Sequence, residues 1–393
     1  MDSALNPYSP GSGLRPPQMV GRAAEIEALE TVVTRTRHGL PSRGLVLTGL
    51  RGVGKTVLLN EMHARAEQAD WLTVRVEARR EQSGAAAVQR VLARGLVAAG
   101  RSLQHRTLSD RMRQALSTIG AFNAKVGATG IELGVQLRAG RADSGDTEID
   151  ILELVEDVSL ALAEEHRALG LFIDEMQDLD DATTGALIAA QHTAGQRGWP
   201  FYVIGAGLPN LPRVLTETRS YAERLFDYRP IGKLPREEGA RALAEPAERF
   251  GAAYTDDALT VLLDAADGYP YFIQEYGQAI WDLAPENLFT ADDAAAAVRY
   301  GLEQLDAGFF RSRWERATPS QRRFLRAMAP DNDTPSQSAD VARRLEMKIT
   351  SLGPNRASLM SKGLIYSPEH GQVAYTVPGM ASYVRRHWED VDD

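Results

Sequence analysis

Apolar residues first recur at spacings of three and four between residues 21 and 36, as in Ile26, Leu29 and Val33. This spacing predicts an amphipathic helix, because such positions share one helix face. Further along, short apolar runs alternate with segments of helical periodicity. The runs predict strands at 44–48, 71–76, 169–173 and 201–204. The segments between and around them predict helices at 55–68, 83–120, 149–166 and 181–195. This alternation predicts an α/β fold, with a parallel sheet covered by helices on both faces.

The pattern changes after Pro230, where the apolar runs typical of strands stop. Residues 236–310 predict several helices, broken at Gly251, at residues 268–270 and at Pro285. From about residue 318 the pattern predicts helices at 320–329, 338–345 and 351–361, then a hairpin at 364–376. This order of elements is typical of a winged helix-turn-helix.

These changes of pattern divide the chain into four predicted parts. Residues 1–18 are rich in Pro, Gly and Ser, which predicts an extended leader rather than a packed element. An α/β core is expected at 19–232, an all-helical lid at 233–312 and a winged helix at 313–393. Within the core, the Gly-rich residues 121–148 predict a mobile loop or a hairpin insertion.

The composition narrows the classes of function. Hydrophobic residues make up 44% and charged residues 25% of 393 residues, an ordinary globular balance. A net charge of −9 argues against coating by nucleic acid, although it leaves room for a local basic patch. The absence of cysteine excludes disulfides, thiolate zinc sites and cysteine nucleophiles. The N-terminus lacks the pattern of a signal peptide and no apolar stretch is long enough for a membrane helix, so we expect a cytoplasmic protein without membrane contact.

Residues 49–56 read GLRGVGKT, which fits the phosphate-loop pattern GxxxxGK[ST]. Glycines let such a loop turn its backbone N–H groups toward phosphate oxygens, and the following helix adds its positive N-terminal end. Lys55 is expected to contact the β- and γ-phosphates, and the Thr56 hydroxyl to bind Mg²⁺. The alternative is a glycine turn with a solvated lysine. The apolar strand directly before Gly49 and the amphipathic helix after it favour the phosphate loop.

Asp174 and Glu175 follow the third predicted strand directly. A carboxylate at the C-terminal edge of a parallel sheet lies beside a phosphate loop, so we expect Asp174 to hold Mg²⁺. Glu175 is placed to orient and deprotonate the attacking water. The alternative is an ordinary acidic loop after a strand, which the phosphate loop makes the weaker interpretation.

Taken together, these segments resemble the origin-recognition-like AAA ATPases, in particular bacterial ATP-binding members of STAND-like character. The resemblance rests on Val20-Gly21-Arg22, GLRGVGKT, LFIDEMQDL from Leu171 and VIGAGLPNL from Val203. It spans about residues 6–385 and implies binding of ATP with Mg²⁺. The nucleotide contacts that it implies, together with those of the loop, are Val20, Gly21, Arg22, Gly49, Leu50, Arg51, Gly52, Val53, Gly54, Lys55, Thr56 and Val57.

The resemblance implies two further catalytic residues. Asn210, after the fourth strand, corresponds to a sensor of the γ-phosphate; the alternative is a helix cap or turn residue. Arg224 lies in the segment that carries an arginine finger, which acts on the nucleotide of a neighbouring copy. Its alternative is a surface or interdomain salt bridge. The chain departs from many relatives at residues 267–272, which contain no second sensor arginine. A slow switch that holds ATP therefore fits as well as rapid hydrolysis.

The C-terminal part adds a candidate DNA contact. Asn355 and Arg356 lie on the predicted recognition helix, and such side chains pair with adenine and guanine edges. Nearby acids make this part almost neutral, which weakens DNA binding. The alternative is a winged helix that packs on the core or on an unknown protein partner.

Three functions follow from these predictions. The first is a regulatory switch ATPase, with a homo-oligomer formed through the ATP site. The second is an ATP-modulated DNA-binding regulator with little turnover. The third is a scaffold with a degenerate site, which the intact Lys55, Thr56, Asp174 and Glu175 disfavour. No acceptor pocket for a kinase or transferase is evident.

Overall fold

The computed structural model describes residues 2–11, 13–78, 85–101, 109–125 and 141–387. The chain forms two compact units, and each is described by itself. The sheet unit comprises residues 23–48 and 58–230. The helical unit comprises residues 1–22, 49–57 and 231–393, so the phosphate-loop residues belong to it.

The sheet unit is built on a five-stranded sheet in the order β2-β3-β4-β1-β5. All neighbouring strands pair in parallel. The strands are β1 (Gly44–Thr48), β2 (Leu72–Glu77), β3 (Leu169–Asp174), β4 (Phe201–Gly207) and β5 (Phe226–Pro230). Every residue of β1, β3 and β4 is buried, as expected for strands covered on both faces. The predicted parallel sheet is confirmed.

The fifth strand, β5, was not predicted from the sequence. It lies at the sheet edge beside β1, and of its residues only Phe226 is buried. Asp227 and Arg229 are two positions apart and form an ion pair at 2.6 Å. A strand with charged residues at alternate positions has no continuous apolar run, so the pattern used for the buried strands does not detect it.

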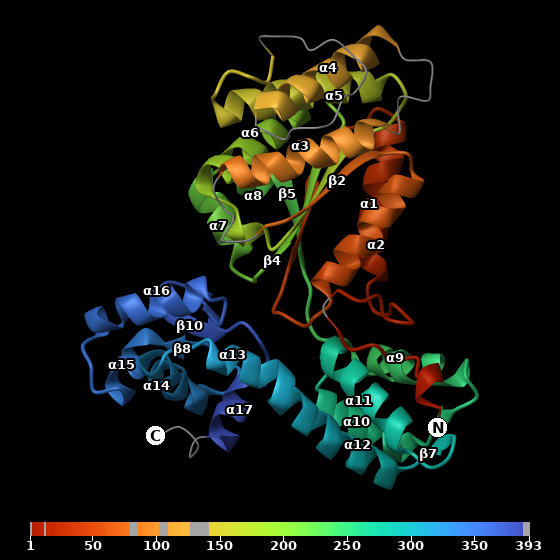
Figure 1. The fold of residues 1–393 in the computed structure, drawn as a ribbon, viewed down its shortest axis with the longest axis vertical. Coiled ribbons are helices and arrows are strands. Elements are labelled where there is room, and N and C mark those ends of the chain that lie inside the picture. Colours follow the sequence, from red (N-terminus) through yellow and green to blue (C-terminus); the bar gives the residue numbers. More distant parts are fainter. Residues whose placement is uncertain (1, 12, 79–84, 102–108, 126–140, 388–393) are drawn as a thin grey trace. The chain divides into compact units, whose positions relative to one another are not determined.

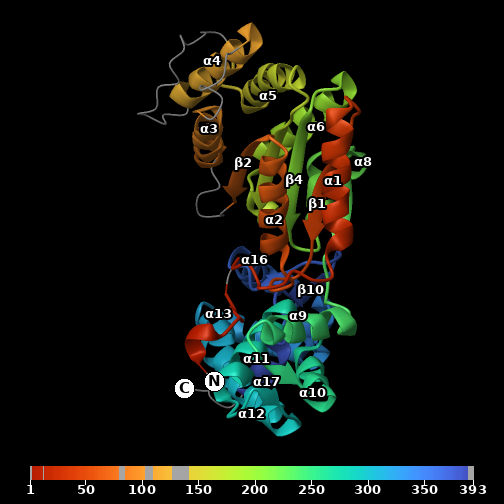
Figure 2. The ribbon, with the colours of Figure 1, turned by 90° about the vertical axis from the view of Figure 1, so that its right-hand side faces the viewer.

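Helices cover both faces of this sheet. Figure 1 shows α1 and α2 on one side of it and α6, α7 and α8 on the other, and Figure 2 shows α1 and α2 in front of the strands. Beyond β2, α3, α4 and α5 form a further helical layer, in which α3 packs on β2 and α5 on α6. The helices are α1 (Ala23–Arg37), α2 (Lys55–Gln68), α3 (Ala85–Arg101), α4 (Asp110–Lys125), α5 (Thr147–Ala163), α6 (Asp181–Arg197), α7 (Leu211–Thr218) and α8 (Ala222–Leu225).

The Gly-rich segment predicted as a loop or hairpin at 121–148 is placed only in part. Its first residues continue α4 to Lys125, and residues 126–140 lie outside the described residues. Where the description resumes, Arg141 donates hydrogen bonds to Glu156 and Asp157 on α5. These charge-assisted bonds attach the end of the segment to the helical layer.

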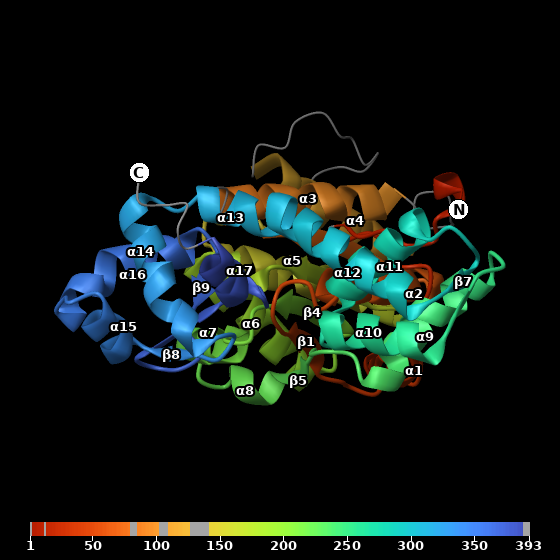
Figure 3. The ribbon, with the colours of Figure 1, turned by 90° about the horizontal axis from the view of Figure 1, so that it is seen from below.

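The helical unit has two groups of helices joined by one helical run. Figure 3 shows α12, the last helix of the first group, continuing toward α13 of the C-terminal group. The π-helical turn η4 (Leu305–Phe310) lies within this run. The first group contains α9 (Arg236–Glu248), α10 (Asp256–Ala266), α11 (Pro270–Leu283) and α12 (Ala291–Gln304). It also contains a two-residue parallel pair, β6 (Ala253–Tyr254) and β7 (Leu288–Phe289), in the region predicted to be all-helical.

The C-terminal group has the predicted order of three helices and a hairpin. Its elements are α13 (Arg311–Glu315), α14 (Pro319–Met328), β8 (Ser336–Gln337), α15 (Ser338–Arg344), α16 (Gly353–Ser361), β9 (Ile365–Tyr366), β10 (Gln372–Tyr375) and α17 (Met380–Arg386). The strands form an antiparallel sheet in the order β8-β10-β9. Neither β8 nor α17 was predicted. The assignment of this group as a winged helix stays a prediction.

The N-terminal segment packs onto the helical unit, in contrast to the extended, unpacked leader expected from its composition. Residues 3–5 form a short 3₁₀ turn, η1 (Ser3–Leu5). Tyr8 is buried, and its hydroxyl donates to the Leu243 carbonyl at 2.5 Å and lies 2.7 Å from the Tyr254 hydroxyl. Burial raises the pKa of Tyr8 well above its ordinary value. One buried aromatic side chain therefore anchors a segment of otherwise loop-like composition.

We expect Tyr8→Phe to lower the free energy of unfolding by about 1–3 kcal/mol, because it leaves a buried carbonyl and a buried hydroxyl short of a partner. Urea unfolding followed by circular dichroism measures this change. Tyr300→Phe is the matched control, since the Tyr300 side chain is exposed. An unchanged unfolding midpoint for Tyr8→Phe would show that the leader does not pack as described.

No helix within the described ranges combines the length and the apolar character that a membrane crossing requires.

Candidate functional site

The phosphate loop, residues 49–56, joins the end of β1 to the start of α2. Gly52 and Gly54 have φ values of 86° and 91°, a region that side chains with a Cβ rarely adopt. A Cβ at Gly49 would lie 2.2 Å from the Ile231 carbonyl oxygen. The three glycines of the motif are therefore required by the backbone path itself. This curled conformation is the one expected of an anion-binding loop.

Lys55 at the start of α2 is almost fully buried, with 6% of its surface exposed. Its ammonium group donates to the Leu50 carbonyl at 2.9 Å. A buried ammonium is costly unless polar or anionic groups compensate its charge. The side chain thus folds back over its own loop, and a phosphate oxygen would be a stronger acceptor than this carbonyl.

The backbone of the loop is bonded to two later parts of the helical unit. The N–H of Arg51 donates to the Thr376 carbonyl at 2.9 Å, just after β10. The N–H of Tyr271, in the first turn of α11, donates to the Gly52 carbonyl at 3.3 Å. The segment 267–272, which lacks a sensor arginine, therefore touches the loop through its backbone. The loop is therefore in direct backbone contact with both α11 and the residue after β10.

The predicted adenine segment, residues 20–22, also lies against the loop. Arg22 donates to the Val53 carbonyl at 3.2 Å and to the Gly232 carbonyl at 2.7 Å. Gly21 has a φ of 65°, and a Cβ there would lie 2.9 Å from Leu234. The structure thus brings Arg22 of this segment into contact with the loop. Contact with a base stays a prediction.

Cationic side chains gather beside the loop. Burial, with the charges of Arg51 and Arg316, lowers the pKa of Arg313 to about 10. The Arg313 guanidinium lies over the Phe309 ring at 4.0 Å, and Phe309 stacks on Tyr271 at 4.7 Å. Arginine charges that contribute to the lowered pKa of Arg313 mark a region of positive potential, which favours an anion.

In the sheet unit, Asp174 ends β3 at the carboxyl edge of the sheet and is 5% exposed. Thr48 ends β1 at the same edge, since β4 pairs in parallel with both strands. One Asp174 carboxylate oxygen accepts the N–H of Glu175 at 2.9 Å. Glu175 itself is left-handed, with φ 49° and ψ 42°. A non-glycine residue held in that region is strained, and such strain clusters at functional sites.

Gln177 is a site residue that the sequence analysis missed. Its amide donates to the Glu175 carboxylate at 2.7 Å and accepts the N–H of Leu208 at 3.0 Å. A Cβ on Gly207 would lie 2.4 Å from the Gln177 amide oxygen, so the glycine makes room for this contact. The two glycines of VIGAG were the sequence signal for this contact, because a glycine in a buried strand often marks a place where another group closely approaches the backbone.

Asn210 lies at the N-terminal end of α7, three residues beyond β4. Its side chain makes no capping hydrogen bond to that helix. Its amide oxygen is buried and has no hydrogen-bond partner in the described part of the chain. Asn210 nevertheless occupies the N-cap position and lies in a turn, so the cap or turn alternative stays open beside the predicted sensor role.

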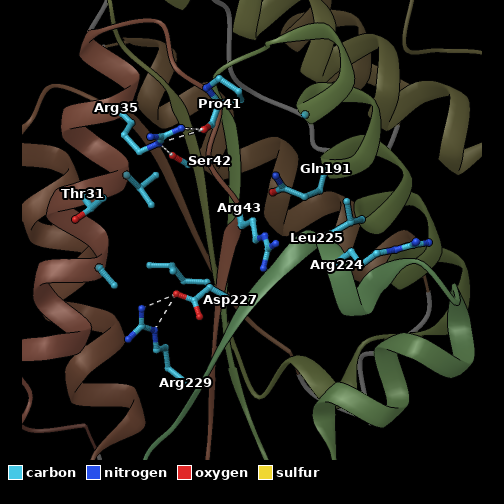
Figure 4. A pocket seen from close by; sticks show the side chains of 14 residues that line it. Thr31, Arg35, Pro41, Ser42, Arg43, Gln191, Arg224, Leu225, Asp227 and Arg229 are labelled. Atoms are coloured by element: carbon cyan, nitrogen blue, oxygen red, sulfur yellow. Dashed lines mark hydrogen bonds and ion pairs between the residues drawn. The ribbon is translucent and has the colours of Figure 1, made fainter.

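Arg224 lies near the amino ends of the strands, whereas Asp174 lies at their carboxyl ends. It comes two residues before Phe226, where β5 begins, and β5 runs parallel to β1. It is exposed and lines a cavity of about 710 Å³ together with Arg43 and Arg229. Figure 4 shows the Arg224 side chain directed away from the Asp227–Arg229 pair. Since a five-residue strand is roughly 16 Å long, Arg224 is remote from Asp174 of its own chain. Any catalytic role for Arg224 requires a second copy.

The two residues predicted to contact DNA are half-buried and hydrogen-bonded within the chain. The Asn355 side chain accepts from the Ser320 hydroxyl at 3.1 Å, and Arg356 donates to the Ser367 hydroxyl at 2.8 Å. Reading a base edge would require both side chains to leave these partners. DNA contact through Asn355 and Arg356 stays a prediction that this geometry does not favour.

The predicted metal ligands fit Mg²⁺ better than a transition metal. Asp174 would supply one carboxylate and Thr56 one hydroxyl. The described residues contain no group of three or more His, Asp or Glu side chains arranged to hold a metal. Mg²⁺ takes its remaining ligands from waters and substrate phosphates, so one carboxylate and one hydroxyl suffice.

Comparisons with known proteins give a family for part of the chain. Residues 18–204 match the family of the AAA ATPase domain, and residues 307–384 match a domain of unknown function. No curated protein sequence matches the chain.

Among solved structures, the chain is similar to a Walker-type ATPase of Pyrococcus abyssi. The TM-score is 0.59 at 15% identity, covering 94% of this chain and 97% of the other, which shows a shared fold. The RuvB Holliday junction branch migration motor of Thermotoga maritima gives a TM-score of 0.44 at 14% identity, over 92% and 96% of the two chains. Cdc6p of Pyrobaculum aerophilum gives 0.46 at 13% identity, over 100% and 99%.

Proposed function

We propose that this protein binds ATP with Mg²⁺ and hydrolyses it slowly as a regulatory switch, in keeping with the match of residues 18–204 to the AAA ATPase domain. The observation that carries the proposal is the curled loop at residues 49–56, with the buried Lys55 ammonium folded onto a carbonyl of that loop. Such a loop offers backbone N–H groups and a cation to phosphate.

In the proposed complex, the loop and Lys55 hold the β- and γ-phosphates, and residues 20–22 lie over the adenine. Thr56 and Asp174 would hold Mg²⁺, and the ion would neutralise charge on the phosphates. Glu175 accepts a proton from the attacking water as its oxygen bonds to the γ-phosphorus. The bond from that phosphorus to the bridging oxygen breaks, which releases ADP and inorganic phosphate. Asn210 donates to a γ-phosphate oxygen and fixes its position.

The switch part of the proposal is supported by the bond from Arg51 N–H to the Thr376 carbonyl. In phosphate loops, backbone N–H groups donate to phosphate. In the present structure the Arg51 N–H donates instead to a carbonyl of the C-terminal group. A bound nucleotide would compete for it or reorient it. Nucleotide state and the C-terminal group are thereby coupled through a single loop.

Two measurements test this function separately. Phosphate release from ATP with Mg²⁺ tests turnover, and its absence at every protein concentration would refute hydrolysis. Amide hydrogen exchange over residues 363–379, compared with ATP, with ADP and without nucleotide, tests the switch. We expect exchange to differ between ATP and ADP. Identical exchange in all three states would refute signalling through the C-terminal group and leave the hydrolysis result standing.

A prediction for Arg224 follows from its position at the far edge of the sheet. If it acts on the nucleotide of a second copy, Arg224→Ala should leave ATP affinity unchanged and lower turnover at high protein concentration by roughly 10³-fold. The measurement is turnover per subunit against protein concentration, with light scattering to follow assembly.

Arg213→Ala is the matched control, because Arg213 is an exposed arginine on α7 that pairs with Glu217. It should behave like the wild-type protein. Turnover per subunit that does not depend on concentration would contradict a finger supplied by another copy. In that case Arg224 is a surface residue of the β5 edge.

A further inference from the structure

The Gln177 side chain is hydrogen-bonded both to Glu175 and to the residue that follows β4. It lies in the short 3₁₀ turn η3 (Met176–Asp178), directly after β3. The preceding Met176 side chain packs where Gly205 has no Cβ, since a Cβ there would lie 2.5 Å from its sulfur. The missing Cβ atoms of Gly205 and Gly207 thus leave space for two consecutive side chains of the turn, and the turn packs closely against β4.

The strand end that Gln177 holds is the one that leads to Asn210. Leu208, whose N–H donates to Gln177, lies two residues before Asn210. The Leu208 carbonyl in turn accepts the N–H of Leu211, the first residue of α7, at 2.9 Å. Asn210 is therefore enclosed in a tight turn whose first residue is bonded to Gln177. Its buried amide oxygen has no partner among the described residues.

We propose that Gln177 is a positioning residue that couples the orientation of Glu175 to contact between Asn210 and the γ-phosphate. The inference rests on the proposed ATP hydrolysis. A displacement of the turn at 208–211 moves the Leu208 N–H, and the Gln177 amide follows it. The other end of the same amide then moves the Glu175 carboxylate. A rigid, planar amide with a bond at each end transmits such a shift better than two independent contacts.

The coupling has a clear physical purpose at this site. Glu175 is in a strained left-handed conformation, and Gln177 donates a hydrogen bond to its carboxylate. This donor carries no charge, and the carboxylate keeps its capacity to accept a proton. The base would then be aligned only when the turn with Asn210 is in its phosphate-bound position.

The test is a double-mutant cycle on kcat with Gln177→Leu and Asn210→Ala. Leucine keeps much of the volume of the side chain and removes both hydrogen bonds. We expect Gln177→Leu to lower kcat by roughly 30-fold, a loss smaller than that of the base itself, with KM and ATP affinity unchanged. The double variant should lose much less than the product of the two single losses, because coupled residues are not additive.

Gln191→Leu is a matched control, because Gln191 on α6 is a glutamine that contacts the other end of β4. The Gln191 amide accepts the N–H of Val203 at 2.8 Å and donates to the Phe201 carbonyl at 3.3 Å. It bridges β4 as Gln177 does, but at the amino end of the strand, away from Glu175. We expect Gln191→Leu to lower the free energy of unfolding and to leave kcat of the folded protein unchanged.

Each outcome bears on the inference. Unchanged kcat for Gln177→Leu, or single losses that multiply in the double variant, would overturn the coupling. A loss of ATP affinity equal to the loss of kcat would show a structural role instead. If the wild-type protein shows no turnover, the proposed hydrolysis fails. If turnover is present and abolished by Glu175→Gln but not altered by Gln177→Leu, only the coupling fails.

Discussion

Replacing Glu175 by glutamine should lower kcat for ATP hydrolysis by roughly 10²–10⁴-fold, the contribution expected of a positioned general base. Glutamine keeps the shape of the side chain and its capacity to bond with Gln177, but it cannot accept the proton of the attacking water. ATP affinity should be unchanged, because no contact with the nucleotide itself is assigned to Glu175. Single-turnover phosphate release together with equilibrium binding of ATP measures both quantities.

Glu223→Gln is the matched control for this variant, since Glu223 is an exposed carboxylate in the first turn of α8. It should retain full turnover. If Glu175→Gln hydrolyses ATP at the wild-type rate, the assignment of the base is wrong. The left-handed backbone of Glu175 would then need another explanation.

Replacing Lys55 by alanine should weaken ATP binding by roughly 10²–10⁴-fold. The estimate corresponds to loss of about two charge-assisted hydrogen bonds of about 1.5–3 kcal/mol each. The folded state should persist, because the substitution removes a buried cation that donates to the Leu50 carbonyl of the same loop. Isothermal titration with ATP and Mg²⁺ measures the affinity, and thermal unfolding checks the fold.

Lys348→Ala provides the control for Lys55→Ala, because Lys348 is an exposed lysine outside the loop. Its ATP affinity should equal that of the wild-type protein. Wild-type affinity in the Lys55→Ala variant would mean that the loop is not the phosphate site.

The parts of the fold that were predicted from the sequence are those with a strong local signal. Buried strands such as Leu169–Asp174 are continuous apolar runs, and the helices between them have clear periodicity. The strand Phe226–Pro230 was not predicted, because its charged residues interrupt any apolar run. Its pairing with Gly44–Thr48 also depends on a partner far away in the chain. The N-terminal segment escaped for a related reason. Its composition is that of a loop, and only tertiary packing around Tyr8 orders it.

The candidate site divides in the same way. Lys55, Thr56, Asp174 and Glu175 belong to motifs with fixed spacing, so their chemistry is visible in the sequence. Gln177 was overlooked, because its importance depends on a hydrogen bond to Leu208 across the sheet. The bond from Arg51 to the Thr376 carbonyl joins residues 325 positions apart and uses backbone atoms on both sides, which leaves no trace in the residue types. Long-range contacts through backbone groups are the class of feature that sequence patterns do not report.

The resemblance to origin-recognition-like AAA ATPases is confirmed at the level of the AAA ATPase domain. The roles implied for Asn210 and Arg224 remain proposals, and their positions constrain them differently. Asn210 lies on the strand-end turn that Gln177 holds, so it can act within its own chain. Arg224 lies at the opposite sheet edge, so it can act only on another copy.

The central claim is that residues 49–56 bind the phosphates of ATP and that Asp174 holds the accompanying Mg²⁺. A crystal structure with Mg²⁺ and a non-hydrolysable ATP analogue tests it most directly. The account predicts phosphate oxygens at the loop N–H groups, the Lys55 ammonium transferred from the Leu50 carbonyl to those oxygens, and Asp174 bound to Mg²⁺ directly or through water. A nucleotide bound elsewhere, or a Lys55 still bonded to Leu50 with the analogue present, would contradict it.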